Sequence, residues 1–279
     1  RGSSCLLVLG VSGAIVFPLV RRFSSAKIVC NIDGVEWRRS KWGFWARKFL
    51  RFSEMLAVKF SHVVIADNAA ISGYIAESYG VDTVTIPYGG NHISETEATA
   101  SEIDLPTDFA LSICRIEPEN NVSLILEAFS RLDTIHLVFV GNWDHSGYGR
   151  KLRADYSHHQ NLHLLDPIYD PGVLNHMRAS CTVYIHGHSA GGTNPSLVEA
   201  MFFCKPIIAF DVEFNRATMC DEGFYFTGVN ELAKFMSELS VIEWSDSAKK
   251  LRDIAEQKYH WNTIGRAYSE VVAQVDEDR

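Results

Sequence analysis

The sequence predicts an α/β protein with two doubly wound domains, each built around a parallel sheet. Short apolar runs typical of strands alternate with helical stretches along almost all of the 279 residues. A stretch from Asn91 to Pro106, rich in Glu, Thr, Ser and Ala, lacks apolar periodicity and divides this alternation into two series. Two series predict two Rossmann-like domains facing a cleft, the usual place for ligands in such sheets.

The first series predicts a domain over residues 1–92, followed by a linker over 93–106. The apolar run from Cys5 to Val20 is shorter than the ~20 residues that a membrane span needs, and Gly10, Gly13 and Pro18 interrupt it. We interpret it as a strand that turns into a helix. Because the chain begins at Arg1 within this pattern, we expect the first domain to be incomplete and the chain to be inactive alone. The expected strands are Cys5–Leu9, Lys27–Asn31, His62–Ala66 and Thr83–Pro87, and the clearest helices are Lys41–Lys59 and Ala69–Tyr79.

The second series predicts a domain over residues 107–243. A helical tail over 244–279 is expected to cross between the domains. The expected strands are Phe109–Cys114, Ile135–Gly141, Leu162–Leu165, Thr182–His186 and Pro206–Phe210, with helices at Val122–Leu132, Tyr148–Ser157, Pro171–Ala179 and Pro195–Cys204.

Composition and charge narrow the class of protein. With 47% apolar and 22% charged residues, the chain has a globular composition that argues against disorder. A net charge of −8 argues against a nucleic-acid partner for the protein as a whole. The six cysteines are scattered without CxxC spacing, mostly in apolar runs, which indicates reduced thiols and a cytoplasmic protein.

The segment from His186 to Met201 carries the strongest functional signal. Asn194 is a natural helix N-cap, and Pro195 suits the first helical position. Free N–H groups at that helix start favour an anion, and Gly191 and Gly192 would let a ligand approach the backbone. The segment therefore predicts a diphosphate site, although an ordinary glycine turn before a capped helix explains the same residues.

Glu199 lies one turn inside that predicted helix, in an otherwise apolar stretch. A carboxylate there can accept hydrogen bonds from both ribose hydroxyls of a nucleotide bound at the helix start. The alternative is an exposed surface glutamate.

At this point the sequence resembles the retaining family 4 glycosyltransferases, which have the GT-B fold of two Rossmann-like domains. The resemblance spans nearly the whole chain. The segment Asn31–Gly43 is similar to a bacterial subgroup that contains rhamnosyltransferases of surface-polysaccharide assembly. The other matching segments are Ile113–Asn121 followed by Ile125–Phe129, Val138–Gly141, Asn194–Met201 and Tyr259–Ile264.

The resemblance implies roles for individual residues. Arg115 matches the arginine that holds the donor diphosphate, and Glu199 matches the glutamate that binds the nucleotide ribose. The residues expected to contact the donor are Gly191, Gly192, Thr193, Asn194, Pro195, Ser196, Leu197 and Ile168. We expect no bound metal and no cofactor.

Two positions depart from the family pattern. Asn120 replaces the lysine after the phosphate arginine, and Gly191 replaces the first glutamate of a spaced pair. The lost lysine removes a positive charge from the leaving diphosphate. The residues that could compensate are Arg38, Arg39, His186 and His188.

Asp33 and Glu36 follow a predicted strand and are expected to contact a sugar hydroxyl or polarise the acceptor hydroxyl, unless they only pair with Arg38 and Arg39. The sequence shows no zinc spacing and no DxD motif at the end of a strand. The resemblance therefore implies hexosyl transfer, with L-rhamnose as one candidate, from a nucleoside diphosphate sugar such as a dTDP sugar to a hydroxyl of a saccharide, which is expected to be lipid-linked.

Two other functions stay open. A dehydrogenase would need G-x-G-x-x-G after a strand, and the spacing of Gly10 and Gly13 does not supply it. A truncated or non-catalytic nucleotide-binding module is the alternative to an enzyme.

The run from Arg38 to Phe52 contains six basic residues and no acidic one. Trp42, Trp45, Phe49, Phe52 and Leu56 recur in it at three- and four-residue steps, which predicts an aromatic stripe on a helix. Such a helix can lie on the anionic lipids at the inner face of the cell membrane. The alternative is that the stripe packs into the core of the first domain.

Overall fold

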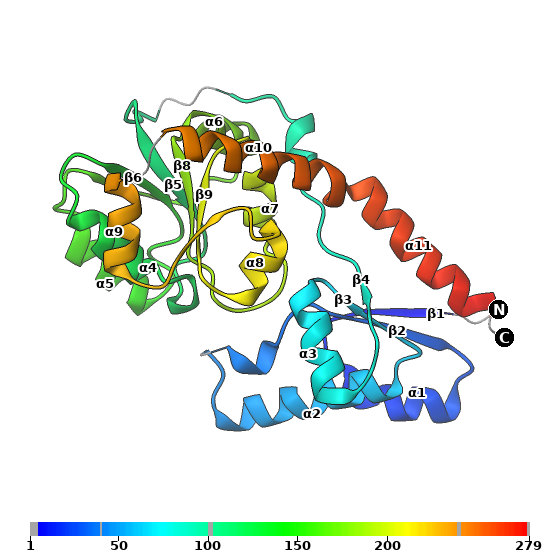
Figure 1. Ribbon diagram of the computed structural model, residues 1–279. Coiled ribbons are helices and arrows are strands. Elements are labelled where there is room, and N and C mark those ends of the chain that lie inside the picture. Colours follow the sequence, from blue (N-terminus) through cyan, green and yellow to red (C-terminus); the bar gives the residue numbers. More distant parts are fainter. Residues whose placement is uncertain (1–4, 40, 100–102, 239–240, 278–279) are drawn as a thin grey trace. The chain divides into compact units, whose positions relative to one another are not determined.

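The computed structural model describes residues 5–39, 41–99, 103–238 and 241–277, and the chain forms two compact units (Figure 1). Unit 1 comprises residues 1–88, 190–193 and 261–279, and unit 2 comprises residues 89–189 and 194–260. Each unit is built around one parallel sheet. This confirms the predicted α/β class with two parallel sheets. The predicted domain limits stay predictions, and residues 100–102 of the expected linker lie outside the described residues.

Unit 1 contains a sheet with the order β1-β2-β3-β4. Its strands are β1 (Cys5–Leu9), β2 (Lys27–Ile32), β3 (Val63–Ala66) and β4 (Val84–Thr85). Its helices, with η marking a 3-10 helix, are η1 (Ala14–Val16), α1 (Phe17–Phe23), η2 (Glu36–Arg38), α2 (Phe44–Phe60), α3 (Ala69–Tyr79) and α11 (Trp261–Glu277).

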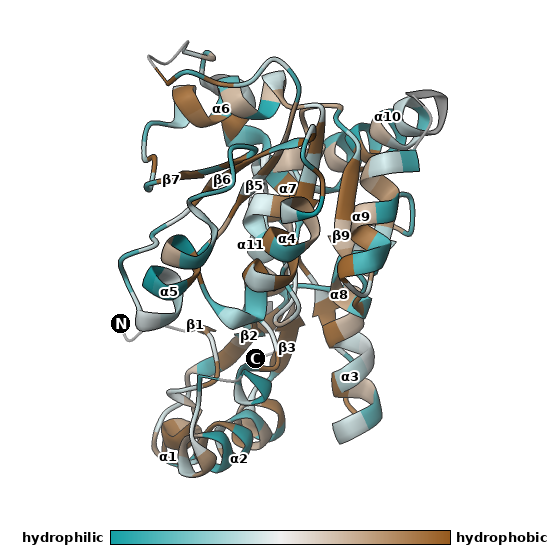
Figure 2. Ribbon diagram, turned by 90° about the vertical axis from the view of Figure 1, so that its left-hand side faces the viewer, coloured by the Kyte–Doolittle hydropathy of each residue, from teal (hydrophilic) through white to brown (hydrophobic). Residues whose placement is uncertain are grey.

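Helix α11 completes the core of unit 1 although it lies at the other end of the chain. Its residues Ile264, Val271 and Val275 are buried against Val29 of β2 and Ile65 of β3. Strands β2 and β3 are coloured as mostly hydrophobic in Figure 2, as expected for strands of a buried parallel sheet. The tail therefore contributes to the sheet that begins the chain.

Unit 2 contains a sheet with the order β10-β9-β8-β5-β6-β7. Its strands are β5 (Phe109–Ile113), β6 (His136–Val140), β7 (Leu162–Leu165), β8 (Val183–His186), β9 (Ile207–Phe210) and β10 (Phe224–Phe226). Its helices are η3 (Asn91–Glu95), η4 (Pro118–Asn120), α4 (Val122–Ser130), α5 (Gly147–Tyr156), α6 (Pro171–Ser180), α7 (Pro195–Met201), α8 (Glu213–Met219), α9 (Val229–Glu238) and α10 (Val241–Lys258).

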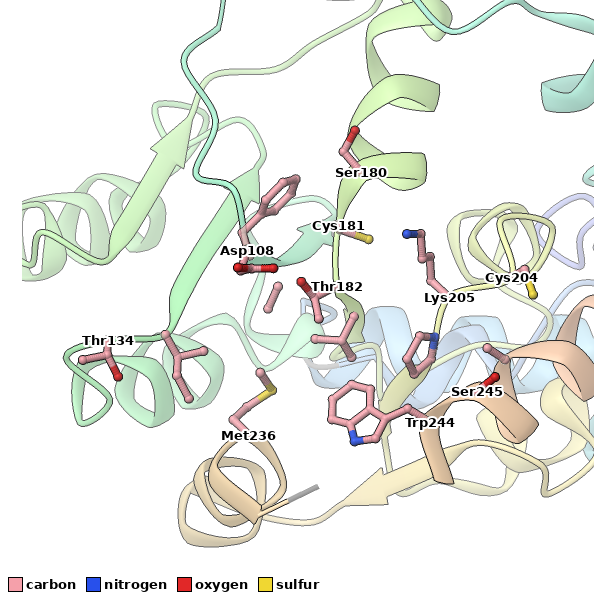
Figure 3. A pocket seen from close by; sticks show the side chains of 16 residues that line it. Asp108, Thr134, Ser180, Cys181, Thr182, Cys204, Lys205, Met236, Trp244 and Ser245 are labelled. Carbon is pink, nitrogen blue, oxygen red and sulfur yellow. The ribbon is translucent and has the colours of Figure 1, made fainter. Parts of the chain in front are cut away.

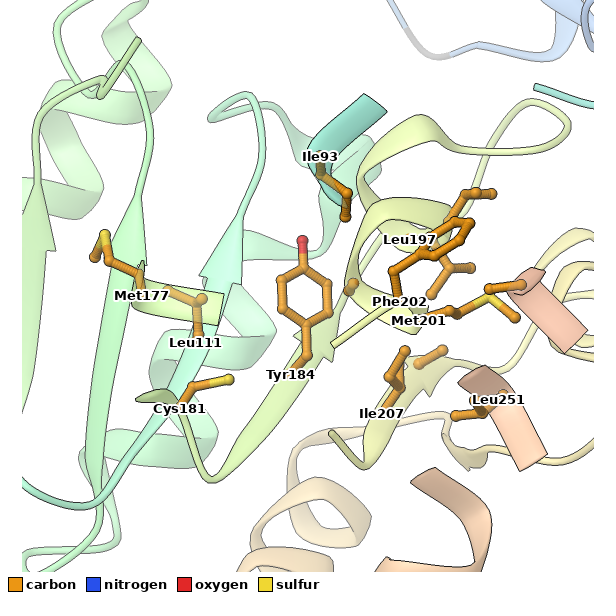
Figure 4. Close-up of a cluster of buried hydrophobic side chains, with 14 of the residues drawn as sticks. Ile93, Leu111, Met177, Cys181, Tyr184, Leu197, Met201, Phe202, Ile207 and Leu251 are labelled. Carbon is orange, nitrogen blue, oxygen red and sulfur yellow. The ribbon is translucent and has the colours of Figure 1, made fainter. Parts of the chain in front are cut away.

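The core of unit 2 places strands β5 and β8 side by side and packs α7 against them. Leu111 of β5 pairs in register with Tyr184 of β8. Figure 4 shows Tyr184 surrounded by apolar side chains, among them Leu111 and Leu197 of α7. This packing fixes which loops meet at the edge of the sheet where β5 and β8 end.

Five elements of unit 2 were not expected from the sequence: η3, η4, β10, α8 and α9. Strand β10 has only three residues and is defined by its pairing with β9, which no local pattern signals. The predicted helical tail consists of two helices, α10 and α11, separated at Tyr259 and His260.

Two further properties bear on the expectations from composition. All six cysteines are free thiols. In the part of the chain that the structure describes, no helix is both long enough and apolar enough to span a bilayer.

Candidate functional site

The candidate site in unit 2 lies where β5 and β8 end. These two parallel strands are neighbours in the sheet, so their carboxyl ends share one edge. Arg115 follows β5, and the segment leading to α7 follows β8. The Tyr184 hydroxyl donates to the Ile113 carbonyl at 3.3 Å, which ties the two strands at this edge. The structure therefore brings the Arg115 loop and the loop after β8 to the same place.

Helix α7 begins as the sequence predicts. The Asn194 side-chain oxygen accepts a hydrogen bond from the Ser196 backbone N–H at 3.0 Å, and Pro195 occupies the first helical position. Leu197 is fully buried and anchors the helix in the core. The Ser196 hydroxyl also donates to the Asn194 side-chain oxygen at 3.0 Å, and burial raises the pKa of the nearby Tyr184 to about 12. The N-cap is confirmed, and contact between these residues and a donor stays a prediction.

Asn120, which stands where the family has lysine, fastens two loops together. Its amide nitrogen donates to the Arg115 carbonyl at 2.6 Å, and its oxygen hydrogen-bonds His188 Nδ1 at 2.6 Å. A Cβ on Gly187 would lie 2.1 Å from the Asn120 carbonyl oxygen, so only glycine fits there. The Arg115 guanidinium is 62% exposed and lies 3.6 Å from Glu117. The loop is thus fixed while its cation faces solvent.

The structure narrows the residues that could compensate for the missing lysine. His186 is buried, and burial lowers its pKa to about 3, with the nearby His188 adding to the shift. It is therefore neutral at physiological pH and cannot supply a positive charge. Arg39 is paired with Glu36 at 3.0 Å. His186 is withdrawn as a candidate.

Glu199 is not a free surface carboxylate. One oxygen pairs with Arg178, and the other lies 3.3 Å from Nε2 of His92, which is half exposed. Arg178 itself is 4% exposed. The buried arginine holds the carboxylate from behind, so a ribose would meet Glu199 on the side of His92.

Arg178 is a site residue that the sequence did not reveal. It stands in the last turn of α6, where a basic residue is expected for its favourable interaction with the helix dipole. Its partner is 21 positions further along the chain. Ile168, an expected donor contact, is partly buried against the core of unit 2, and its role stays a prediction.

The residues of the glycine loop that belong to unit 1 have a different environment from the expected one. A Cβ on Gly192 would lie 2.0 Å from Asp67 Oδ1, and a Cβ on Gly34 would lie 2.9 Å from Cα of Gly191. The Thr193 N–H donates to Asp67 Oδ2 at 3.1 Å. Asp67 therefore occupies the space where a side chain at Gly192 would lie, and contact of Gly191 and Gly192 with a ligand stays a prediction.

Asp67 of unit 1 is a second buried charged residue that the sequence did not reveal. It follows β3 directly, at the carboxyl end of a parallel strand, which is a position where functional side chains gather. It is 1% exposed, and burial raises its pKa to about 7, with the negative charge of Asp33 adding to the rise. Asp33 is exposed at the surface, but the surrounding protein also desolvates its carboxylate and raises its pKa.

Glu36 is held by its neighbours. Its oxygens lie 3.0 Å from Arg39 and 3.3 Å from Lys41, and one accepts a hydrogen bond from Trp42 Nε1 at 3.1 Å. These contacts give Glu36 a structural role, and its contact with a sugar stays a prediction. Over the described ranges, no three His, Cys, Asp or Glu side chains gather in a way that could hold a metal ion.

A large hollow of about 670 Å³ lies elsewhere in unit 2 (Figure 3). Phe109 begins β5, and Thr182 and Pro206 directly precede β8 and β9, so this hollow lies at the amino ends of the strands. It contains none of the expected site residues. This hollow is therefore separate from the candidate site at the carboxyl ends of β5 and β8.

Comparison with known proteins assigns both parts of the chain. Residues 94–261 match the family described as glycosyl transferases group 1, and residues 5–91 match a domain of unknown function, DUF1972. No curated protein matches the chain in sequence.

Several solved structures share the fold. Sucrose-phosphate synthase from Thermosynechococcus elongatus is 15% identical with a TM-score of 0.84, covering 99% of this chain and 74% of its own. A glycosyltransferase from Rickettsia africae is 15% identical with a TM-score of 0.75, covering 98% and 76%. The pneumococcal O-GlcNAc transferase GtfA, solved with UDP and GlcNAc, is 15% identical with a TM-score of 0.67, covering 96% and 56%.

Proposed function

Since the chain belongs to the glycosyl transferases group 1 family, we propose that it transfers a hexosyl group from a nucleoside diphosphate sugar to a hydroxyl of a saccharide acceptor. Its fold is that of GT-B glycosyltransferases. The observation that carries the proposal is the meeting of the Arg115 loop with the start of α7 at one edge of the sheet.

Each group at this edge has a role toward the donor. Arg115, with its exposed guanidinium, takes the diphosphate. The backbone N–H groups at the start of α7, which Asn194 caps, are proposed to bind the diphosphate as well, and Glu199 is proposed to accept the ribose hydroxyls once His92 moves aside. Fixed groups around the diphosphate stabilise the charge that develops as the sugar leaves, an effect worth several kcal/mol in a dry site.

The proposed reaction retains the configuration of the anomeric carbon. The acceptor oxygen attacks from the face that the diphosphate leaves, and the departing phosphate oxygen takes the acceptor's proton. The bond from the anomeric carbon to the phosphate oxygen breaks as the new glycosidic bond forms. The protein's part is then mainly geometry and charge, with Asp33 as the residue proposed to contact the acceptor.

For the substrates, the proposal follows the resemblance of Asn31–Gly43 to rhamnosyltransferases. The donor is a dTDP-linked L-rhamnose, and the acceptor is a lipid-linked oligosaccharide of bacterial surface polysaccharide. The six free thiols suit a cytoplasmic enzyme that works at the inner face of the membrane.

Nucleotide binding and product analysis test the proposal. Thermal unfolding is measured with dTDP, UDP, GDP and NAD, and we expect stabilisation by one nucleoside diphosphate and none by NAD. Products are then analysed with a panel of donors. Stabilisation by NAD alone would refute the donor assignment. Nucleotide binding without transfer to any acceptor would favour a non-catalytic nucleotide-binding module.

A further inference from the structure

Helix α2 exposes an aromatic and basic face that the fold does not use. Phe44 is 63% exposed, Trp45 80%, Phe49 44% and Phe52 49%, whereas Leu56 is buried. The stripe predicted from the sequence therefore faces solvent except at Leu56 and the half-buried Trp42. This excludes the alternative that the whole stripe packs into the core of the first domain. Contiguous exposed apolar side chains of this size mark an interaction surface.

Beside these aromatic residues lies a hollow of about 520 Å³. It is formed by η2, by the middle of α2 and by the second half of α3, all of them in unit 1. None of the described residues that line it is acidic. The lining residues are Trp37, Arg38, Lys48, Arg51, Phe52, Met55, Tyr74, Ser78 and Tyr79.

The cations of this hollow are held by aromatic rings rather than by carboxylates. The Arg38 guanidinium carbon lies 5.4 Å from the Trp37 ring and 4.9 Å from the Tyr74 ring, and that of Arg51 lies 5.1 Å from the Trp37 ring. Among the described residues, no carboxylate forms an ion pair with Arg38, Lys48 or Arg51. Stacking uses the faces of the guanidinium groups and leaves their N–H edges for an anion.

A buried carboxylate organises the aromatic wall from behind. Glu54 is fully buried, and one of its oxygens accepts hydrogen bonds from the hydroxyls of Tyr74 and Tyr79, each at 2.7 Å. Burial raises the pKa of both tyrosines, and their hydrogen bonds to Glu54 add to the rise. The rings therefore stay neutral and fixed. Three cations at the hollow exceed the single charge of Glu54, so an anion is favoured there.

We propose that the exposed face of α2 docks on a membrane, and that the hollow bordered by Arg38, Lys48 and Arg51 takes the headgroup phosphate of an anionic lipid. Charge complementarity favours this occupant, because basic residues are concentrated on this face although the protein as a whole has a net charge of −8. Aromatic side chains next to cations are the composition of a helix that lies at a bilayer interface. Helix α1 packs beside α2 and adds exposed Leu19 and Phe23 (Figure 2).

The inference rests on the proposed function in one respect only: a lipid-linked acceptor gives the contact a use. Vesicle binding is measured without donor or acceptor, so a failure here leaves the nucleotide-binding test untouched. Likewise, a failure of the nucleotide-binding test leaves the vesicle-binding test untouched.

The first experiment is co-sedimentation of the purified chain with vesicles of phosphatidylglycerol and phosphatidylcholine, compared with phosphatidylcholine alone. We expect salt-sensitive binding to the anionic vesicles. Each basic residue at such a surface changes partitioning about fivefold, so Arg38→Gln/Lys48→Gln/Arg51→Gln should weaken binding about a hundredfold. The matched control, Lys234→Gln/Lys249→Gln/Arg252→Gln, makes the same change of charge at exposed positions in unit 2 and should bind nearly as the parent does.

A second pair of variants separates the hollow from diffuse attraction. Arg38→Lys/Arg51→Lys keeps the charge but loses the planar fork that stacks on Trp37, and it should weaken anionic-vesicle binding severalfold. Trp45→Ser/Phe49→Ser leaves the hollow intact and should reduce the binding that survives high salt. Thermal unfolding of each variant shows whether it is folded.

Three outcomes would overturn the inference. One is equal indifference to both kinds of vesicle. Another is that inorganic phosphate stabilises the parent chain but not Arg38→Lys/Arg51→Lys, while the parent does not bind vesicles. This result would assign the hollow to a free phosphate compound. The third is dimerisation in light scattering that Trp45→Ser/Phe49→Ser abolishes, which would assign the face to a second copy of the chain.

Discussion

Replacing Arg178 with methionine should destabilise unit 2 strongly, because it leaves the carboxylate of Glu199 without its buried partner. Arg178 is 4% exposed and the Glu199 side chain 18% exposed. Methionine is unbranched and fills much of the arginine's space without its charge. The change therefore tests the charge more than the packing.

The magnitude follows from the burial of the pair. Removing one partner of a buried ion pair costs about 3–5 kcal/mol. The lower end, about 3 kcal/mol, applies here because His92 stays 3.3 Å from the other oxygen of Glu199 and is half exposed. For a domain of this size, about 2–4 °C of midpoint is lost per kcal/mol, which predicts a fall of about 6–12 °C.

Thermal and urea unfolding of a double-mutant cycle provide the assay. Glu199→Met should also destabilise unit 2, because it strands the Arg178 cation. The double variant Arg178→Met/Glu199→Met removes both charges and should return to within about 1 kcal/mol of the parent. Additive losses in the double variant, or parental stability in both single variants, would refute a buried, energetically coupled pair.

Three other substitutions test the surroundings of Asp67 and the exposed Arg115. The pKa of Asp67 is raised from 3.8 to about 7, so its protonated form stabilises the folded state fully below about pH 4, and this stabilisation is lost as the pH rises to about 7. Asp67→Asn should flatten that part of the curve of unfolding free energy against pH, over which the parent loses about 4 kcal/mol. Urea unfolding at a series of pH values measures this curve, and an unchanged slope against pH would contradict the assignment. Gly192→Ala places a Cβ 2.0 Å from Asp67 Oδ1 and should lower stability by about 1–3 kcal/mol, whereas the control Gly73→Ala, with open space around it, should not lower it. Arg115→Ala should lower kcat/KM about a hundredfold and weaken nucleotide binding without changing the unfolding midpoint; unaltered kinetics would remove Arg115 from the donor site.

Local signals made much of the fold predictable. Strands β1 and β7 and helix α3 have the predicted bounds. Helix α3 starts at an asparagine cap, Asn68, and ends at Gly80 in the left-handed conformation, with φ of 66°. Helix α7 starts at the predicted cap for the same reason. Where a boundary depends on one residue and its immediate neighbours, sequence is sufficient.

The features that were missed depend on residues far apart in the chain. Strand β10 exists through its pairing with β9, and Arg178 acquires its meaning from Glu199 in another helix. The two glycines after Ala190 suited a ligand or another part of the protein equally well. Only the contact with Asp67 decides which one occupies the space beside Gly192.

The contacts of the candidate site in unit 2 divide its residues into fixed and exposed groups. Asn120 holds the Arg115 loop to His188 through hydrogen bonds, and Arg178 fixes the carboxylate of Glu199. The Arg115 guanidinium, in contrast, is mostly exposed to water. A diphosphate that bound there would replace this water around a loop that is already in place, so little backbone ordering would oppose binding. Asn120, at the position where the resemblance to family 4 glycosyltransferases implies a lysine, thus supplies no positive charge but fastens the loop that presents Arg115.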